Sequence, residues 1–211
     1  MAGQNLREQN KQRNFERILQ VAKQLFELKG YEATTTREIA ETAQIATGTL
    51  FLYARDKAEL LLFTYGEAIS EITTSVFASL PKDLPLLDAL MYIFTPFFQF
   101  YAQHPENARF FLKELLFYSG EHKGRQSFHL QTEHFIKQLA QFVRHAQERG
   151  EIRPDVDSRQ AASSFFAMYF ATLTTWLGGF FLLNTASVDQ LRAVFELQIK
   201  GMLPPDSTSE I

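Results

Sequence analysis

Two short helical patterns joined by a tight turn, in residues 35–57, constrain the fold of this chain more than any other feature. Thr35 and Glu38 have the Thr-x-x-Glu spacing of a capping box, in which side chains satisfy backbone N–H groups at the start of a helix. The apolar residues after Glu38 recur with helical spacing. Residues 47–53 give about two turns of a second helix, which is too short to be stable alone. We therefore expect its exposed face to bind a partner.

This arrangement is typical of a helix-turn-helix, in which the second helix enters the DNA major groove and the first crosses the backbone. Gly48 lets the backbone come close to a phosphate, while Thr47 and Thr49 offer hydroxyl groups. Tyr53 offers a phenol, whereas Leu50 is expected to point inward. The residues predicted to contact DNA are Thr36, Arg37, Thr47, Gly48, Thr49, Phe51, Leu52, Tyr53 and Lys57.

Lys57 stands at the start of the next predicted helix. Asp56 and Glu59 form a second capping-box-like pair there, so Lys57 falls in the first turn of that helix. Its ammonium group and the free N–H groups of the helix end can both reach a phosphate. The N-terminus fits the same use, because residues 1–30 hold six Lys or Arg and three Glu, although the whole chain has a net charge of −3.

In their order and spacing, these motifs resemble the N-terminal domain of the TetR family of bacterial transcriptional repressors. The resemblance runs without gaps over about residues 11–62. It implies an all-helical homodimer that a small molecule releases from its double-stranded DNA operator, with the last two helices forming a four-helix bundle between the subunits. Two copies of the 47–53 helix would then lie about 34–36 Å apart, one turn of DNA. The residues that carry the resemblance are Phe26, Gly30, Tyr31, Thr34 to Ala40, Gly48 to Tyr53 and Asp56 to Leu60.

Three positions depart from the pattern of that family. The turn carries Gln44 where Gly is usual, and this position is expected to need a left-handed conformation. Ala46 replaces the Ser that normally caps the second helix, and Ala cannot cap. Ala54 replaces a Phe. These departures predict a second helix with little order of its own.

Composition narrows the function classes. Cysteine is absent from the 211 residues, which excludes disulfides and thiolate metal sites and suits a reducing cytoplasm. The polar N-terminus lacks the apolar core of a signal peptide, so we expect a cytoplasmic protein. His129 and Glu133 have the i, i+4 spacing of a metal-chelating pair, but such isolated pairs are usually solvated surface. Without a nucleophile–base pair, a phosphate-binding glycine loop or paired carboxylates, we predict no enzyme activity, no metal and no cofactor.

Helical patterns cover most of the chain, and no segment alternates with the period of a strand for long enough to suggest a sheet. We predict an all-α fold of about nine helices, with a helix-turn-helix domain of residues 1–58 and a ligand-binding and dimerisation domain of residues 59–211. Gly30 and Gly150 are predicted to end helices, and Pro96 to interrupt one. The longer predicted helices cover residues 11–29, 57–80, 86–103, 105–118 and 123–149, and two more begin at the capping pairs Asp157–Gln160 and Ser187–Gln190.

Residues 161–183 leave an alternative open, because they contain no charge over a length that can span a bilayer. On this alternative the chain is a membrane-anchored or structural helical protein, and its N-terminal similarity is incidental. Several Ser and Thr residues dilute the run, and an amphipathic helix follows it. A helix that is apolar on all sides can equally be buried in a protein core, so we expect no membrane contact.

Phenylalanine is the strongest compositional bias, with 21 residues, of which only Phe15, Phe26 and Phe51 precede residue 59. Any one of these residues, taken singly, is most simply explained as part of the hydrophobic core. As a set they exceed what packing needs, because flat rings leave gaps between helices. We therefore expect an aromatic-lined cavity for an apolar small-molecule effector, which would act through the helix that begins at Lys57. The residues predicted to line it are Phe94, Phe97, Phe98, Tyr101, Phe111, Tyr118, His134, Phe165, Tyr169 and Trp176, with His134 as a polar contact.

Overall fold

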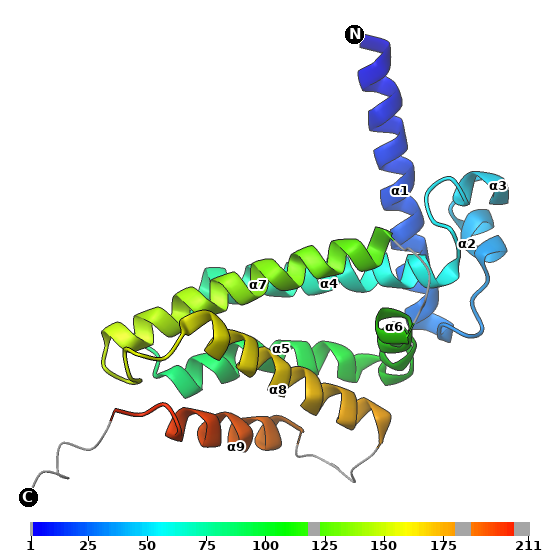
Figure 1. Ribbon diagram of the computed structural model, residues 1–211. Coiled ribbons are helices and arrows are strands. Elements are labelled where there is room, and N and C mark those ends of the chain that lie inside the picture. Colours follow the sequence, from blue (N-terminus) through cyan, green and yellow to red (C-terminus); the bar gives the residue numbers. More distant parts are fainter. Residues whose placement is uncertain (1, 118–122, 180–186, 205–211) are drawn as a thin grey trace, which may run out of the picture. The chain divides into compact units, whose positions relative to one another are not determined.

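The computed structural model of the chain describes residues 2–117, 123–179 and 187–204, and within these ranges it contains helices and no strand (Figure 1). The all-α prediction is confirmed. The helices are α1 (Ala2–Lys29), α2 (Thr36–Thr42), α3 (Thr47–Leu50), α4 (Lys57–Ser79), α5 (Leu86–Gln103), α6 (Pro105–Phe117), α7 (Lys123–Glu148), α8 (Ser158–Gly178) and α9 (Ser187–Lys200).

The chain forms two compact units, neither of which is continuous in sequence. The first unit contains Met1–Ile69 and His104–His129, so that α6 and the first turns of α7 join α1, α2, α3 and the first half of α4. The second unit contains Ser70–Gln103 and Leu130–Ile211, with the rest of α4 and α7 together with α5, α8 and α9. The predicted division between residues 58 and 59 stays a prediction.

In the first unit, an apolar stripe of α1 packs with α2, and α2 packs with α3. Ile18 and Ala22 from α1 are fully buried, as are Ile39 of α2 and Leu50 of α3. Helix α1 ends where Gly30 adopts a φ of +86°, a left-handed conformation that glycine reaches without steric cost. The stop predicted at Gly30 is confirmed.

In the second unit, α9 packs against both α5 and α8 (Figure 1). Aromatic rings fill the space between them: the ring centroid of Phe94 lies 4.7 Å from that of Tyr169 and 5.5 Å from that of Phe195. Phe94, Phe165 and Phe195 are fully buried. Ring pairs at these separations stabilise a core beyond the area they bury, so this cluster holds the three helices together.

Helix α8 buries one face in this unit, with Ala161, Phe165 and Tyr169 among its buried residues. The carboxylate of Asp157 accepts a hydrogen bond from the N–H of Gln160 at 2.8 Å, which confirms the predicted cap. None of the helices in the described ranges is both long enough and apolar enough to cross a membrane. The alternative of a span over residues 161–183, of which 180–183 lie outside the described residues, therefore has no support.

The helix ends agree with the predicted ones to within a few residues, except at α1 and α3. Helix α1 begins at Ala2 rather than near Lys11, and side-chain pairs one turn apart, such as Gln12 with Glu16 at 2.9 Å, support its exposed part. Pro96 lies inside α5 as predicted, but it does not interrupt the helix, which runs from Leu86 to Gln103. Helix α9 begins at Ser187, but the side chain of that predicted cap lies outside the described part of the chain.

Candidate functional site

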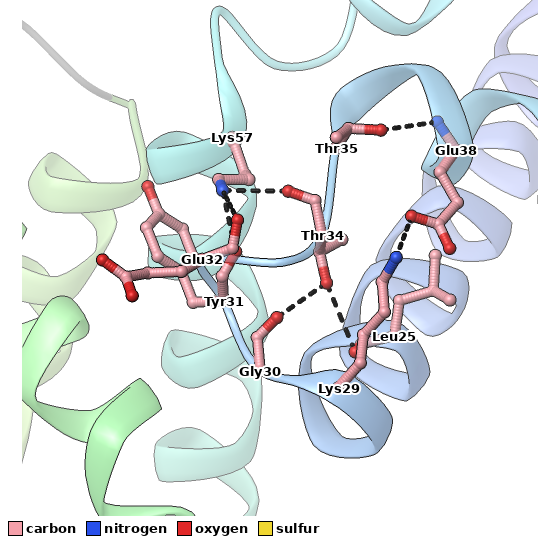
Figure 2. Close-up of polar contacts among 9 residues, drawn as sticks. All are labelled: Leu25, Lys29, Gly30, Tyr31, Glu32, Thr34, Thr35, Glu38 and Lys57. Carbon is pink, nitrogen blue, oxygen red and sulfur yellow. Dashed lines mark hydrogen bonds and ion pairs between the residues drawn. The ribbon is translucent and has the colours of Figure 1, made fainter.

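The start of α2 is fixed by side chains on both sides (Figure 2). Thr35 is extended, and its Oγ1 accepts a hydrogen bond from the N–H of Glu38 at 3.2 Å, which confirms the Thr35 half of the predicted capping box. The carboxylate of Glu38 pairs with the ammonium of Lys29 at the end of α1. The first turn of α2 is therefore tied to the last turn of α1. We refer to α1, α2 and α3 together as the head.

The turn between α2 and α3 needs one residue in the left-handed region. Gln44 has a φ of 54°, which is the conformation expected at the position where Gly is usual. The N–H of Ile45 donates to the carbonyl of Ala40 at 3.0 Å and closes the turn on α2. Leu50 is fully buried, as predicted, and anchors α3 to α2.

The regular part of α3 is shorter than predicted. It covers Thr47–Leu50, and residues 51–53 continue as a turn. Ala46 is extended at the N-cap and makes no side-chain hydrogen bond to the helix, because a methyl group cannot accept one. The N–H groups of Leu52 and Tyr53 each donate to the carbonyl three residues earlier, which tightens this last stretch. With one turn and no cap, α3 depends on packing for its order.

The side chains predicted to contact DNA lie on the surface of α2 and α3. Arg37, Gly48, Phe51 and Leu52 are exposed, and Leu52 is 77% exposed. Packing does not account for two adjacent large apolar residues on an open surface, which indicates a surface that meets a partner. DNA contact by each residue stays a prediction. The half-buried members of the predicted set are Thr36, Thr47, Thr49, Tyr53 and Lys57.

The ammonium of Lys57 points at the loop between α1 and α2 (Figure 2). It donates to the carbonyls of Tyr31 at 2.7 Å, Glu32 at 3.3 Å and Thr34 at 2.9 Å. It also lies 4.2 Å from the ring centroid of Tyr31, within cation–π distance. Because an ammonium has three N–H donors, each has an acceptor here. The predicted phosphate contact of Lys57 would require these bonds to be exchanged.

The groups around this ammonium have shifted pKa values. Burial lowers the pKa of Lys57, and the nearby Glu32 carboxylate partly opposes the shift. Burial also raises the pKa of Tyr31 to about 12, so its phenol stays neutral near pH 7. The hydroxyl of Thr34 donates to the carbonyl of Gly30 at 2.8 Å. The loop is thus held by the neutral hydroxyl of Thr34, which bonds to Gly30, and by the partly buried ammonium of Lys57.

Glu59 makes hydrogen bonds at the starts of two helices, α4 and α7. The sequence predicted only the contact at the start of α4. The predicted pair is confirmed, since the N–H of Glu59 donates to Oδ1 of Asp56 at 2.8 Å. The Glu59 carboxylate accepts from the N–H of Arg55 at 2.7 Å and from the N–H of Lys123, the first residue of α7, at 2.8 Å. No local pattern announces the second contact, because 64 residues separate its partners. Asn107 of α6, described below, was also missed.

Most residues predicted to bind the effector meet in the second unit. The ring of Tyr169 lies 4.7 Å from Phe94, 6.0 Å from Phe97 and 5.5 Å from Phe98. Trp176 lies 5.9 Å from Phe98 and is half-buried. Tyr101 and Phe165 are buried as well, and the ring of Phe165 meets that of Phe195 on α9. We call the following residues the aromatic cluster: Phe94, Phe97, Phe98, Tyr101, Phe165, Tyr169 and Trp176.

Two predicted effector residues lie elsewhere. Phe111 is in the first unit, where its ring stacks on Tyr65 at 4.6 Å, because α6 packs in that unit. His134 is exposed on α7, because the next residue, Phe135, takes the buried position. Tyr118 lies outside the described residues.

A groove of about 800 Å³ lies along another face of α5, beside the second half of α4. Apolar side chains such as Ile72, Val76 and Met91 line it, together with polar ones that include Glu71 and Asp88. Its volume is within the range of small-molecule sites. Helix α5 therefore contributes to the aromatic cluster with Phe94, Phe97 and Phe98 and to the groove with Met91 and Tyr92.

The missing cap of α3 gives a first testable prediction. Ala46→Ser supplies a hydroxyl at an N-cap that is already extended, so the protein should be more stable by about 0.5–2 kcal/mol. Amide exchange of residues 47–50 should slow, as measured by hydrogen exchange in the free protein. Ala46→Val, which cannot cap, is the matched control. Equal exchange in the Ser and Val variants would show that α3 does not depend on its cap.

Two family descriptions match the chain. Residues 18–62 match "Bacterial regulatory proteins, tetR family", which includes α2 and α3. Residues 87–177 match "Tetracyclin repressor-like, C-terminal domain", which includes most of α5, α6, α7 and α8.

Similar proteins are regulators as well. The fatty acid metabolism regulator protein of Bacillus subtilis is 21% identical over 195 residues, which cover 91% of this chain and 97% of that protein. An uncharacterized helix-turn-helix transcriptional regulator of the same organism is 41% identical over 71 residues, which cover 32% of this chain and 38% of that protein.

Solved structures share the fold. FadR of Thermus thermophilus, a TetR family repressor in complex with lauroyl-CoA, is 21% identical with a TM-score of 0.73, covering 92% of this chain and 98% of that one. FadR of Bacillus subtilis in complex with stearoyl-CoA is 21% identical with a TM-score of 0.66, covering 89% and 99%. The head, the helical second unit and both family matches lead to one identification: the chain belongs to the TetR family and is a DNA-binding transcriptional regulator.

Proposed function

We propose that the chain is a repressor that binds a pseudo-palindromic operator as a homodimer in the cytoplasm and is released by an apolar small molecule. The observation that carries DNA binding is the exposure of Arg37 on α2 and of Phe51 and Leu52 directly after α3, with Thr47 and Thr49 half-buried on α3. Arginine and hydroxyl groups make many of the contacts that proteins form with DNA phosphates.

For the effector we propose a fatty acyl thioester of coenzyme A. Two structural relatives are described in complex with lauroyl-CoA and stearoyl-CoA, and a curated relative regulates fatty acid metabolism. The second unit supports an apolar ligand, since rings from α5 and α8 meet in the aromatic cluster. The acyl chain would enter beside α5, between the rings of that cluster.

Release follows if the effector prefers a conformation in which the two heads of a dimer no longer match the operator. Helix α4 belongs to both units, with Lys57 at its first residue. A displacement of α4 would therefore move the residue that holds the loop before α2. We retain the domain division at residues 58 and 59 as part of this proposal.

Selection from random DNA tests the repressor proposal. Bound fragments should contain inverted repeats whose half-site centres lie about 10–10.5 base pairs, or a multiple, apart. Arg37→Ala with Thr49→Ala should weaken binding, because both changes remove predicted contacts. Absence of any enriched sequence from a folded dimer would reject DNA recognition by this surface.

Fluorescence tests the effector, because Trp176 is the single tryptophan of the chain. Lauroyl-CoA should change Trp176 emission and weaken operator binding about 5- to 150-fold, the usual range of allosteric coupling. Coenzyme A alone is the control for the acyl chain. In a variant with Trp176→Phe and Tyr92→Trp, the single tryptophan lies in the groove. Its fluorescence emission should not change when lauroyl-CoA is added. A response from the groove variant alone would place the ligand there, and silence of both proteins would reject acyl-CoA.

The salt dependence of binding tests the role of Lys57. Lys57→Met removes the ammonium while keeping much of the apolar stem, so the loop before α2 should loosen and operator affinity should fall. Because that ammonium is bonded to three carbonyls, the slope of log K against log salt should not change. A slope smaller by about one unit would instead show a phosphate contact.

A further inference from the structure

Asn107, the third residue of α6, has a buried amide that contacts the head. It is 4% exposed. Its Nδ2 donates to the carbonyl of Phe26 at 2.7 Å, and its Oδ1 accepts from the N–H of Tyr31 at 2.8 Å. Both partners lie at the C-terminal end of α1, one before Gly30 and one after it. The Asn107 side chain therefore forms hydrogen bonds to the backbone on both sides of Gly30, where α1 ends.

The same loop is held from α4. Lys57 donates to the carbonyls of Tyr31 and Thr34, and the ring of Tyr31 packs on Phe110 of α6 at 4.8 Å (Figure 2 shows the Lys57 side). Residues 30–34 are thus fixed between two helices. Thr35, the N-cap of α2, follows at once. A shift of the loop would move the start of α2 and its exposed surface.

We propose that Asn107 is a positioning residue for DNA binding, through which α6 sets the place of α2. This inference rests on the proposed recognition of DNA by α2 and α3. Helix α6 begins at Pro105, two residues after α5 ends at Gln103. It therefore follows directly in the chain after the helix that carries the aromatic cluster, and its own link to the head includes the pair of hydrogen bonds made by Asn107.

Removal of the amide has an asymmetric effect. The carbonyl of Phe26 keeps its bond from the N–H of Gly30, at 3.0 Å. The N–H of Tyr31 loses its acceptor, and a buried donor without an acceptor is unfavourable enough to make the backbone move. The expected result is a displaced loop rather than a displaced α1.

The experiment compares Asn107→Leu, which keeps the volume and removes both hydrogen bonds, with Gln103→Leu, which removes an exposed amide at the end of α5. The dimeric full-length proteins are titrated with an operator selected by the wild type. Asn107→Leu should bind at least about tenfold more weakly, a change of about 1.4 kcal/mol, with an unchanged salt slope. Gln103→Leu should bind like the wild type. Amide exchange should quicken in residues 31–38 and stay unchanged in α5 and α8.

A double-mutant cycle separates positioning from general stability. If Asn107 and Lys57 hold one loop, then Asn107→Leu combined with Lys57→Met should lose less affinity than the two single losses multiplied together. Independent effects, or wild-type affinity in a folded Asn107→Leu protein, would overturn the inference. If the Asn107→Leu variant does not fold, Asn107→Ser is used instead, because the smaller side chain leaves room for a water molecule. The same loss of operator affinity is then expected. A wild type that selects no DNA would reject the proposed function itself, whereas unchanged exchange of residues 31–38 would reject only the role of Asn107.

Discussion

The head depends on one constraint: two of its helices, α2 and α3, are too short for their terminal backbone groups to find partners within the helix. A helix of four or seven residues leaves most of its backbone donors or acceptors without an internal partner. A side chain therefore supplies a partner at the start of α2, where Thr35 accepts from the N–H of Glu38. Where the sequence provides no such side chain, at Ala46, the helix shrinks to a single turn. The order of α2 therefore depends on a polar cap, whereas the order of α3 depends on the burial of Leu50.

The second unit is stabilised in a different way. Its helices are long, and rings from α7, α8 and α9 meet Phe94 of α5 edge to face, stacked and tilted, respectively. Such contacts are numerous and individually weak, so a ring can turn or withdraw without the loss of a fixed bond. A unit of this kind can admit an apolar ligand, whereas the head, held by directional hydrogen bonds, has few alternative arrangements.

Local rules account for what the sequence predicted well. The caps at Thr35 and Asp157 and the stop at Gly30 each involve residues within four positions, and each was found as expected. The contacts of Asn107 with Tyr31 and of Lys57 with the same loop join residues 76 and 26 positions apart. No periodicity encodes such pairs. For the same reason, Phe111 was assigned to the effector site on its residue type, although the packing of α6 places it in the first unit.

The membership of α6 in the first unit has a consequence for how such regulators can be recombined. A chimera that takes only the residues before α4 from another regulator would pair a foreign loop with the resident Asn107 and Phe110, which contact Tyr31 in this chain. The transferable module is therefore discontinuous. Exchange of DNA specificity between relatives should succeed when the segment of α6 that contacts the loop before α2 is transferred together with the head. Substitutions in that segment of α6 and in the loop should also be correlated during evolution.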